Sequence, residues 1–334
     1  MNRQMEGKTL SEHIKSEARR LGFFSSGIAE AKAVDANEAR RLLAWLADGG
    51  NADMQYMGNH TDMRLDPRLL MPGVKSIVSV ALAYAPSHRI PEDEYQIAAY
   101  AYGADYHDVV KQKLHSLAAS IAAIRPIAYR AFCDSAPVLE RYWAVQAGLG
   151  WVGRNRQLII PQAGSMFFLG ELFLDIELDY DSPVTPRCGN CRACVDACPT
   201  HALQNAASPC PDGCPHSTTT FSAARCLSYL TIENRGPIPS SVASSMRGTI
   251  YGCDRCLQAC PWNRFAPTAT EPLLQPSAEL LQMTKERWHD LTPETYRRLF
   301  KGSAVKRAKY EGLMRNIRAN IGATHDSDAV TDAD

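Results

Sequence analysis

The spacing of apolar positions along the first part of the chain predicts a mixed α/β domain. Apolar side chains recur with helical spacing in three stretches, which favours helices near Leu10–Leu21, at Ala36–Ala47 and at Tyr106–Ile124. Arg125-Pro126 ends the third helix, because a proline disfavours helical geometry in the residue before it. Short apolar runs rich in β-branched residues lie between the helices and are typical of strands. The alternation of the two patterns indicates a sheet packed against helices.

The apolar runs of this first part are the predicted strands. Ser76–Ala85 reads SIVSVALAYA and predicts a buried strand. Ile127–Cys133 predicts a second strand, which leads into Asp134 and is followed by a helix over Val138–Ala147. Three further runs complete the sheet, with a turn at Gly164: Leu158–Ile160, Phe167–Leu169 and Leu172–Leu178.

Changes in composition divide the rest of the chain. Tyr180–Arg187 carries two prolines and predicts a linker, and a cysteine-rich segment follows to about residue 264. Beyond Ala266–Pro276 helical periodicity returns, and it ends near Gly322. The final THDSDAVTDAD is acidic and poor in apolar residues, which predicts disorder. We expect an α/β domain at 1–183, a cysteine-rich domain at 184–264, a helical segment at 265–322 and a disordered tail at 323–334.

Charge and hydropathy narrow the class of protein. Lys and Arg total 36, as do Asp and Glu, so no overall field points to nucleic acid and any such surface is local. The N-terminal residues lack the uninterrupted apolar core of a signal peptide. The longest apolar stretches are strand length and fall far short of the roughly 18 residues that cross a bilayer. We expect a cytoplasmic protein that does not contact membranes.

The eleven cysteines are confined to a small part of the chain. They are absent from residues 1–132, appear once at Cys133, and then crowd between Cys188 and Cys260. Clustering of this kind in a cytoplasmic protein argues for metal rather than for disulfides. Cys133 itself ends a predicted strand and is more typical of a small buried apolar residue than of a ligand.

Eight of these cysteines form two related motifs. The first, at residues 188–199, is C-x2-C-x2-C-x3-C-P without a mismatch, and the second, at 253–261, is C-x2-C-x3-C-P, with Cys226 supplying its missing cysteine. In such pairs three closely spaced cysteines wrap one iron–sulfur cube and the fourth ligates the other. We therefore expect a bacterial ferredoxin-like domain with two 4Fe–4S clusters. One is bound by Cys188, Cys191, Cys194 and Cys260, and the other by Cys198, Cys226, Cys253 and Cys256.

Zinc is the structural alternative, because C-x2-C pairs also bind zinc, but a tandem of these two motifs is unusual for it. Cys210 and Cys214 lie in SPCPDGCPHS, a Pro/Gly/Ser-rich stretch that looks like an inserted loop. With His216 they make an incomplete ligand set, so we expect loop cysteines without a metal role.

Two clusters alone do not account for the length of the chain. A two-cluster ferredoxin needs only about 60–80 residues. Clusters relay single electrons, so the long N-terminal part is expected to consume them. No G-x-G-x-x-G follows an early strand, which weighs against a dinucleotide-binding domain. Asp105-Tyr106-His107 begins like a cobalt-ligating D-x-H-x-x-G loop, but Val110 stands where that loop has glycine.

Several stretches together resemble the epoxyqueuosine reductase family, the cobalamin and iron–sulfur enzymes that complete queuosine in tRNA. The resemblance runs from about residue 10 to 320 in the family's order, although the Cys210 loop is longer than expected and some members carry a C-terminal helical-repeat extension that this chain lacks. The matching stretches are YGADYH at 102–107, DSAPVLER at 134–141, GLGWVGRN at 148–155, GS at 164–165, LGE at 169–171, CLSYLTIE at 226–233, YGCD at 251–254, GSAVKR at 302–307 and LMRNI at 313–317.

The resemblance implies reduction of epoxyqueuosine at the wobble position of tRNA, with cobalamin as nucleophile and the clusters as electron relay. It also implies that Asp134 protonates the oxygen that leaves the epoxide carbon, which requires a raised pKa near neutral pH. From the residues alone, an equally good interpretation is that Asp134 caps the helix near Val138. The substrate is then tRNA carrying epoxyqueuosine, the electron donor an unidentified low-potential reductant, and the protein a monomer.

The resemblance also suggests which residues line the cobalamin site, between the α/β and cluster domains, although each also suits an ordinary structural role. They are Tyr102, Gly103, Asp105, Tyr106, His107, Asp134, Leu158, Ser165, Leu169, Ser228, Thr231, Gly252 and Asp254, with Gly164 and Gly170 as further places of close backbone approach.

A basic segment near the C-terminus is the candidate tRNA surface. Between Lys285 and Arg318 ten Lys and Arg stand against four Asp and Glu, a local excess in a neutral chain. Lys301, Lys306, Arg307 and Arg315 are the predicted phosphate contacts, with Lys309 and Arg318 beside them. A solvated helix face is the alternative. Two other functions stay open: a reductive dehalogenase-like corrinoid reductase, which leaves the basic segment unexplained, and a two-cluster electron-transfer protein, which would bind no cobalamin.

Overall fold

A four-stranded antiparallel sheet organises the first part of the chain in the computed structural model, which describes residues 3–205 and 219–328. Its strands are β1 (Ser25–Glu30), β2 (Ser76–Ala83), β7 (Phe167–Leu174) and β4 (Tyr129–Phe132), in the order β1-β2-β7-β4. The predicted strand at Ser76 is confirmed, and every residue of β2 is buried. Strand β1 was not predicted.

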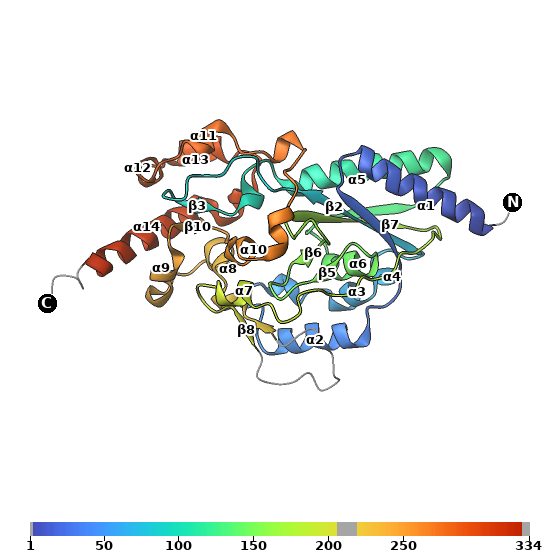
Figure 1. The fold of residues 1–334 in the computed structure, drawn as a ribbon, viewed down its shortest axis with the longest axis horizontal. Coiled ribbons are helices and arrows are strands. Elements are labelled where there is room, and N and C mark those ends of the chain that lie inside the picture. The colour runs from blue at the N-terminus through green and yellow to red at the C-terminus, as the bar shows by residue number, and fades with distance from the viewer. Residues whose placement is uncertain (1–2, 206–218, 329–334) are drawn as a thin grey trace.

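Helices pack against both faces of this sheet. The helices α1 (Arg3–Arg20) and α5 (Tyr106–Ile124) lie together on one face, whereas α6 (Glu140–Gln146) packs on the other (Figure 1). The helix α2 (Ala36–Ala47) and the short helices η1 (Gln55–Met57), α3 (Thr61–Leu65) and α4 (Pro67–Leu70) connect β1 to β2. The predicted bounds of α2 and α5 are therefore confirmed, and the layered α/β architecture follows from the two apolar faces of the sheet.

The strand β7 corrects one expectation. We predicted two strands separated near Gly170, but β7 continues through this residue in register with Val80 of β2. A Cβ atom at Gly170 would lie 2.6 Å from Val110 Cγ1 of α5. The glycine therefore lets α5 pack closely on the strand rather than ending it.

The C-terminal region packs with a segment from the first part of the chain. Strand β3 (Gln96–Ile97) pairs in parallel with β10 (Thr249–Tyr251), and η2 (Ala99–Ala101) follows β3. A hydrophobic core unites residues 90–102 with buried residues between 232 and 317. The salt bridge between Lys113 and Glu271, 2.7 Å long, joins α5 to the same region. The sequence boundaries proposed at 183 and 264 are thus crossed by extensive packing.

The strands β5 (Trp151–Val152) and β6 (Leu158–Ile159) precede the cysteine-rich segment and form a two-stranded sheet of their own, so the run at Leu158 does not join the four-stranded sheet as expected. The cysteine-rich segment consists of short elements: α7 (Ala193–Asp196), β8 (Leu203–Asn205), β9 (Thr219–Phe221), η3 (Ala223–Arg225), α8 (Leu227–Ile232), α9 (Ser240–Met246), α10 (Arg255–Gln258) and η4 (Pro261–Phe265), and η5 (Pro272–Leu274) follows it. The loop that carries Cys210, Cys214 and His216 lies outside the described residues.

The helical C-terminal segment is built from short capped helices and one long one. It contains α11 (Ala278–Leu281), α12 (Lys285–His289), α13 (Pro293–Leu299), η6 (Ala304–Ala308) and α14 (Lys309–Asp328). The side chains of Ser277, Thr284 and Thr292 accept hydrogen bonds at the first turns of the three short helices. Helix α14 continues past Gly322, where we expected helix to end; residues 329–334 of the predicted tail are not described. Within residues 3–205 and 219–328, no helix combines the length and apolarity needed to cross a membrane.

Candidate functional site

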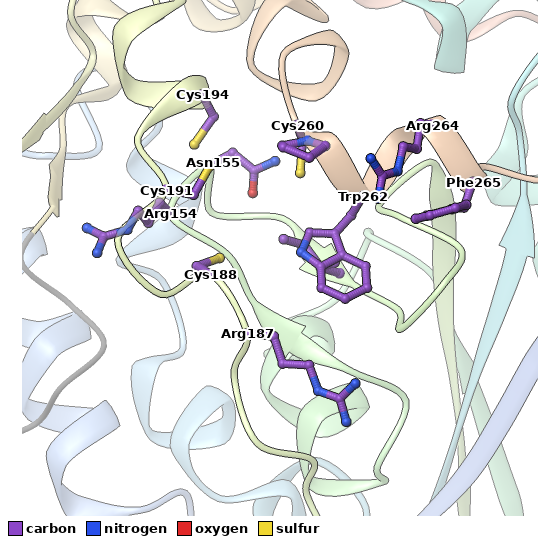
Figure 2. Close-up of a pocket in the computed structure, with 12 residues that line it drawn as sticks. Arg154, Asn155, Arg187, Cys188, Cys191, Cys194, Cys260, Trp262, Arg264 and Phe265 are labelled. Atoms are coloured by element: carbon purple, nitrogen blue, oxygen red, sulfur yellow. The ribbon is translucent and has the colours of Figure 1, made fainter.

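Four of the predicted cluster cysteines surround one cavity. Cys188, Cys191, Cys194 and Cys260 line a space of about 270 Å³, and in Figure 2 they stand around it. Helix α7 carries Cys194, and Cys260 lies between α10 and η4, so the two motifs converge here. The Trp151 indole N–H donates a hydrogen bond to Cys188 Sγ at 3.4 Å. Hydrogen bonds of this kind tune the sulfur ligands of a cluster.

The geometry of this cavity does not suit a single zinc ion. Zinc draws its ligands to about 2.0–2.3 Å from one point. Within the described part of the chain no three Cys, His, Asp or Glu side chains form such a group, although four cysteines share this cavity. The nine cysteines that the structure describes are all free of disulfides. A large cofactor with several thiolate contacts fits the space better than one ion.

The second predicted set of cysteines lies on the inner side of the same region. Cys226 precedes α8 and Cys198 follows α7, while Cys256 of α10 packs against the core beneath the sheet. The backbone N–H of Ala202 donates to Cys198 Sγ at 3.2 Å. Burial raises the pKa of the Cys253 thiol to about 12. This thiol is therefore neutral until a cationic centre displaces its proton.

Beside the second set, the cluster region is joined to the α/β part by hydrogen bonds. The Ala99 N–H donates to Asp254 Oδ2 at 2.7 Å, and Tyr100 donates through its hydroxyl to Tyr251 at 3.3 Å. The Gly252 N–H donates to Thr231 Oγ1 at 2.9 Å. Three residues predicted to line a cofactor, Thr231, Gly252 and Asp254, therefore meet at this boundary. Thr231 is fully buried, and a Cβ at Gly252 would lie 2.5 Å from Ala98 Cβ, so both also have a structural role.

A second group of predicted residues surrounds Asp134. The ring of Tyr106, at the start of α5, is stacked between His107 and Phe168, with centroid distances of 4.1 and 4.2 Å. This packing fixes its hydroxyl, which donates a hydrogen bond to Asp134 Oδ2. His107 Nε2 lies 3.9 Å from the same oxygen. The Asp134 side chain is 62% exposed, so its carboxyl is accessible to a bound substrate.

The capping interpretation of Asp134 is not supported. Leu139 is the N-cap residue of α6, whereas Asp134 has a φ of +51° and turns its carboxyl toward Tyr106. Asp105, in contrast, caps α5 by accepting the His107 N–H at 3.3 Å. Asp105 also contacts His107 Nδ1 at 2.6 Å and Lys306 Nζ at 3.0 Å. Because of His107 and Lys306, the pKa of Asp105 is lowered despite its burial.

Two glutamates that we did not predict lie behind Asp134. The Asp134 backbone N–H donates to Glu140 Oε1, and Glu171 of β7 is fully buried on the adjacent strand. Burial raises the pKa of both carboxyl groups, and repulsion by Asp134 adds to the rise at Glu140 while repulsion by Glu140 adds to it at Glu171. Neither carboxyl oxygen of Glu171 has a hydrogen-bond partner, although both are buried. The two buried oxygens would be satisfied if Glu171 shared a proton with Glu140. The sequence feature that could have indicated this pair is the glutamate inside the apolar run FFLGELFL, since buried carboxyl groups are rare without a partner.

The remaining predicted cofactor residues are dispersed. Tyr102 and Leu158 are buried in separate hydrophobic cores, and Leu169 packs against the core that contains Leu158. The backbone N–H of Ser165 donates to Asn263 Oδ1 at 2.6 Å. A Cβ at Gly103 would lie 2.4 Å from Leu273 O, and one at Gly164 would lie 2.1 Å from Asn263 Oδ1, so both glycines permit close contacts within the protein. Ser228 lies half-buried in α8.

The predicted tRNA-binding residues have different surroundings. Lys301 is exposed, and Lys306 pairs with Asp105. Arg307 pairs with both oxygens of Glu233 at 2.9 Å. Arg315 donates to the carbonyls of Asn234, Gly236 and Leu230 at 2.6–2.9 Å, which indicates a structural role. The four do not form one open basic face.

Comparison with known proteins gives consistent matches over most of the chain. Residues 64–135 match the family model described as epoxyqueuosine reductase QueG, DUF1730, and residues 187–263 match the 4Fe-4S double cluster binding domain. The chain is 45% identical to the epoxyqueuosine reductase of Cellulophaga algicola, covering 92% of this chain and 96% of that protein. The relative from Leadbetterella byssophila is also 45% identical, covering 92% and 97%.

Solved structures agree with these matches. An epoxyqueuosine reductase crystallised with an epoxyqueuosine-modified tRNA-Tyr stem loop superposes with a TM-score of 0.83 at 26% identity, covering 97% of this chain and 84% of that one. The Bacillus subtilis enzyme, described with its catalytic aspartate loop swung out of the active site, gives a TM-score of 0.82 at 26% identity and the same coverage.

Proposed function

The chain belongs to the epoxyqueuosine reductase family, and we propose from this premise that it reduces epoxyqueuosine in tRNA to queuosine. The epoxide accepts two electrons and two protons and becomes an alkene and water. The observation that carries the proposal is the accessible Asp134 carboxyl, hydrogen-bonded to Tyr106, beside a double iron–sulfur cluster region. One part of the site can thus deliver protons and the other electrons.

The protein has a 4Fe–4S double cluster binding domain at residues 187–263. We assign one cluster to Cys188, Cys191, Cys194 and Cys260, because these four side chains share one cavity. The other is assigned to Cys198, Cys226, Cys253 and Cys256, on the inner side. The spacing of the motifs and the double-cluster family match over residues 187–263 support this assignment. The outer set, which includes the exposed Cys191, would hold the cluster that accepts electrons from a reductant, and the inner set would hold the cluster nearer the α/β part.

The residues around Asp134 are compatible with cobalamin. The macrocycle brings its own nitrogen ligands, so no protein cage for a bare ion is required, and no such cage occurs among the described residues. The half-buried aromatic group of Tyr106 and His107 and the exposed Asp134 carboxyl offer an apolar surface with a polar edge. Tyr106, His107, Asp134 and Asp254 are the residues we assign to this site. When bound, cobalamin supplies a strongly nucleophilic reduced cobalt, which can open an epoxide.

Within this site, the residues of the chain hold and move protons. Asp134 would give its proton to the oxygen that leaves the epoxide carbon. Tyr106 keeps the carboxyl oriented through its hydroxyl, and the ring stacking keeps Tyr106 itself in place. His107, tied to Asp105 through Nδ1, presents Nε2 toward Asp134 and can restore the proton. The second proton comes from the same group or from water.

The tRNA surface is the least defined part of the proposal. Arg307 lies above the ring of Tyr56 at 5.8 Å, and the Tyr56 side chain is among the exposed aromatic groups of the protein. Burial raises the pKa of Tyr56, and the carboxylates of Glu233 and Asp134 raise it further, whereas Arg307 lowers it. Aromatic and basic side chains together suit an unstacked nucleoside and its phosphates. We propose that Tyr56, Arg307 and Lys301 meet the anticodon arm.

One anaerobic assay tests the function. Reconstituted protein with cobalamin, a chemical reductant and tRNA containing epoxyqueuosine should convert the nucleoside to queuosine, detected by nucleoside analysis. Omission of cobalamin should abolish conversion. Conversion without cobalamin would remove that cofactor from the proposal, and no conversion in the complete mixture would contradict the proposed function.

A further inference from the structure

The outer cysteine cavity is surrounded by basic side chains. Arg154, Arg187 and Arg264 all line it, and no acidic residue does. Figure 2 shows the three guanidinium groups on different sides of the cavity rather than within it. Arg187 and Arg264 are exposed, whereas Arg154 is half-buried and donates to Gly189 O at 2.8 Å. Three positive charges around one opening make a local field in a chain that is neutral overall.

Apolar surface accompanies these charges. Phe265 is 46% exposed and lies in the same lining, with the Arg264 guanidinium carbon 4.5 Å from the centre of its ring. Trp262, next to Cys260, is half-buried and contacts the ring of Trp151 edge-on at 5.1 Å. Aromatic and arginine side chains are enriched in protein–protein interfaces. The opening therefore combines steering charge with a surface that a protein partner can cover.

Only the outer cysteine set includes an exposed residue, although Cys194 and Cys260 of that set are buried. Cys191 of the outer set is exposed, and its neighbours Gly189 and Asn190 are exposed as well. Cys256 of the inner set packs against the hydrophobic core between the four-stranded sheet and the helices α1 and α5. Asp254, two residues earlier, accepts a hydrogen bond from the Ala99 N–H. An external reductant thus meets the outer set first, while the inner set lies toward Asp134.

We propose that the surface formed by Arg154, Arg187, Arg264, Trp262 and Phe265 is the docking site of an acidic, low-potential electron-carrier protein. This inference rests on the proposed function, because it requires a cluster at the outer cysteines. Each docking event oxidises the carrier by one electron and reduces the cluster by one. Two events supply the two electrons that the epoxide consumes.

An electron carrier suits this surface better than tRNA does. The substrate nucleoside has to reach Asp134. A basic side chain, Lys306, lies near that residue, because Lys306 pairs with Asp105 and Asp105 contacts His107. The arginines, in contrast, share their cavity with the exposed Cys191. A carrier protein gains from this position because electron transfer requires a short path to the cluster. Complementary charge would raise its association rate by about 10- to 1,000-fold at low salt.

The test compares two double variants of the reconstituted holoenzyme. Arg187→Glu/Arg264→Glu reverses the charge at the opening, and Arg19→Glu/Arg20→Glu makes the same change at two exposed arginines of α1. Reduced flavodoxin of net negative charge serves as the carrier, and cluster bleaching is followed by stopped-flow absorbance at several salt concentrations. Photoreduced deazaflavin, a small reductant, serves as the second electron source, and tRNA binding is measured separately.

We expect the Arg187/Arg264 variant to lose about tenfold or more of the second-order rate with flavodoxin at low salt, and the difference to shrink at high salt. Iron content, reduction by deazaflavin and tRNA affinity should remain those of the wild type, and the α1 variant should match the wild type throughout. The milder Arg187→Ala/Arg264→Ala variant covers the case in which charge reversal disturbs folding.

Three results would overturn the inference. One is an unchanged rate with flavodoxin, and another is equal slowing with flavodoxin and deazaflavin. The third is weaker tRNA binding with an unchanged flavodoxin rate, which would assign the surface to tRNA. Failure of the wild type to convert epoxyqueuosine with deazaflavin would contradict the proposed function instead, so the two failures are distinguishable.

Discussion

The backbone N–H of Asp134 donates a hydrogen bond to the carboxyl group of Glu140, six residues further along the chain. Asp134 has a left-handed backbone conformation, which for a residue other than glycine costs about 1–2 kcal/mol. Glu140 begins α6, and its charge, after burial, helps to raise the pKa of the buried Glu171 of β7. The proposed proton donor is therefore held by a bond from its own backbone to a rigid element.

Glu140→Ala should release the loop that carries Asp134. The hydrogen bond to its backbone is lost, and so is the carboxyl group that interacts with the buried Glu171. We expect turnover to fall by about tenfold or more, corresponding to at least 1.4 kcal/mol, while iron and cobalamin contents stay unchanged. Amide hydrogen exchange at residues 133–136 should accelerate. In Glu140→Gln an amide oxygen can still accept the bond, so unaltered exchange in the alanine variant, or equal loss in both variants, would argue against an anchoring role.

The Glu140–Glu171 pair predicts a dependence of stability on pH. Burial raises both folded pKa values above the unfolded value of 4.5, so the folded state binds more protons than the unfolded state above that pH. The free energy of unfolding should therefore decrease as pH rises above 4.5, until the pair has ionised. Each unit of raised pKa corresponds to about 1.4 kcal/mol.

Denaturant unfolding between about pH 5 and pH 8 measures this dependence. Glu171→Gln should flatten it, because the variant has one fewer carboxyl to ionise. Glu177→Gln, at a largely exposed glutamate on the same part of the chain, is the matched control and should leave the slope unchanged. A wild-type slope in Glu171→Gln would mean that the pair does not exchange the proton on unfolding.

Tyr106→Phe separates the hydrogen bond to Asp134 from the packing of the ring. The stacked contact with Phe168, 4.2 Å between centroids and 2° between planes, should persist without the hydroxyl. A hydrogen bond to a charged group contributes about 1.5–3 kcal/mol, so turnover should fall by roughly 10- to 100-fold. Tyr95→Phe, which removes a hydroxyl bonded to His289, should retain the wild-type turnover.

Asp134→Asn should retain both clusters and cobalamin but lose about 10²–10⁴-fold in turnover, the usual contribution of a general acid. Iron analysis and the cobalamin absorption spectrum check that the site is intact. Near-normal turnover would require another proton donor, for which His107, 3.9 Å from Asp134 Oδ2, is the candidate.

Cys226→Ala should leave one complete set of cluster ligands. The wild type is expected to hold about eight irons and eight acid-labile sulfides after anoxic reconstitution, and the variant about four of each. Cys210→Ala/Cys214→Ala is the control, because these cysteines lie outside both motifs, and it should keep the full content. Stoichiometric zinc in wild-type protein made with ample iron would contradict the cluster assignment.

Local sequence patterns predicted much of the fold and part of the site. The long helix at Tyr106 and the buried strand at Ser76 follow from periodicity alone, and the double-cluster domain follows from the spacing of its cysteines. The sequence could not reveal the core that joins residues 90–102 to the C-terminal helices, because that packing depends on long-range contacts. We expected separate strands at Phe167–Leu169 and Leu172–Leu178, although β7 continues through Gly170, where the missing side chain admits α5.

The difference between local sequence patterns and long-range contacts also explains the errors in the candidate site. Asp134 and Tyr106 lie near each other because α5 and β4 are neighbours, and the resemblance to a family anticipated them. Glu171 gave only a weak signal, a single charge in an apolar strand. Arg315 was grouped with exposed basic residues, but its three bonds to backbone carbonyls depend on a loop some 80 residues earlier. Charge counts do not distinguish a free arginine from one that stabilises a loop.

The contacts of Arg315 and Lys306 within the protein determine which residues should be changed to test tRNA binding. Lys301→Ala/Arg307→Ala removes two exposed positive charges. It leaves in place the hydrogen bonds of Arg315 to backbone carbonyls and the Lys306–Asp105 pair beside the active site. Each phosphate contact contributes about 0.7–0.9 to the slope of log affinity against log salt, so the slope should decrease by at most about 1.8. Cluster and cobalamin contents should not change, and Arg19→Ala/Arg20→Ala on α1 should bind tRNA as the wild type does. Arg315→Ala, in contrast, should lower the free energy of unfolding by about 1–3 kcal/mol, because carbonyls near α8 lose their donor. If the Lys301/Arg307 variant keeps the wild-type affinity and salt slope, the C-terminal segment is a solvated helical face. The phosphate contacts would then lie among other basic residues around the mouth of the Asp134 site.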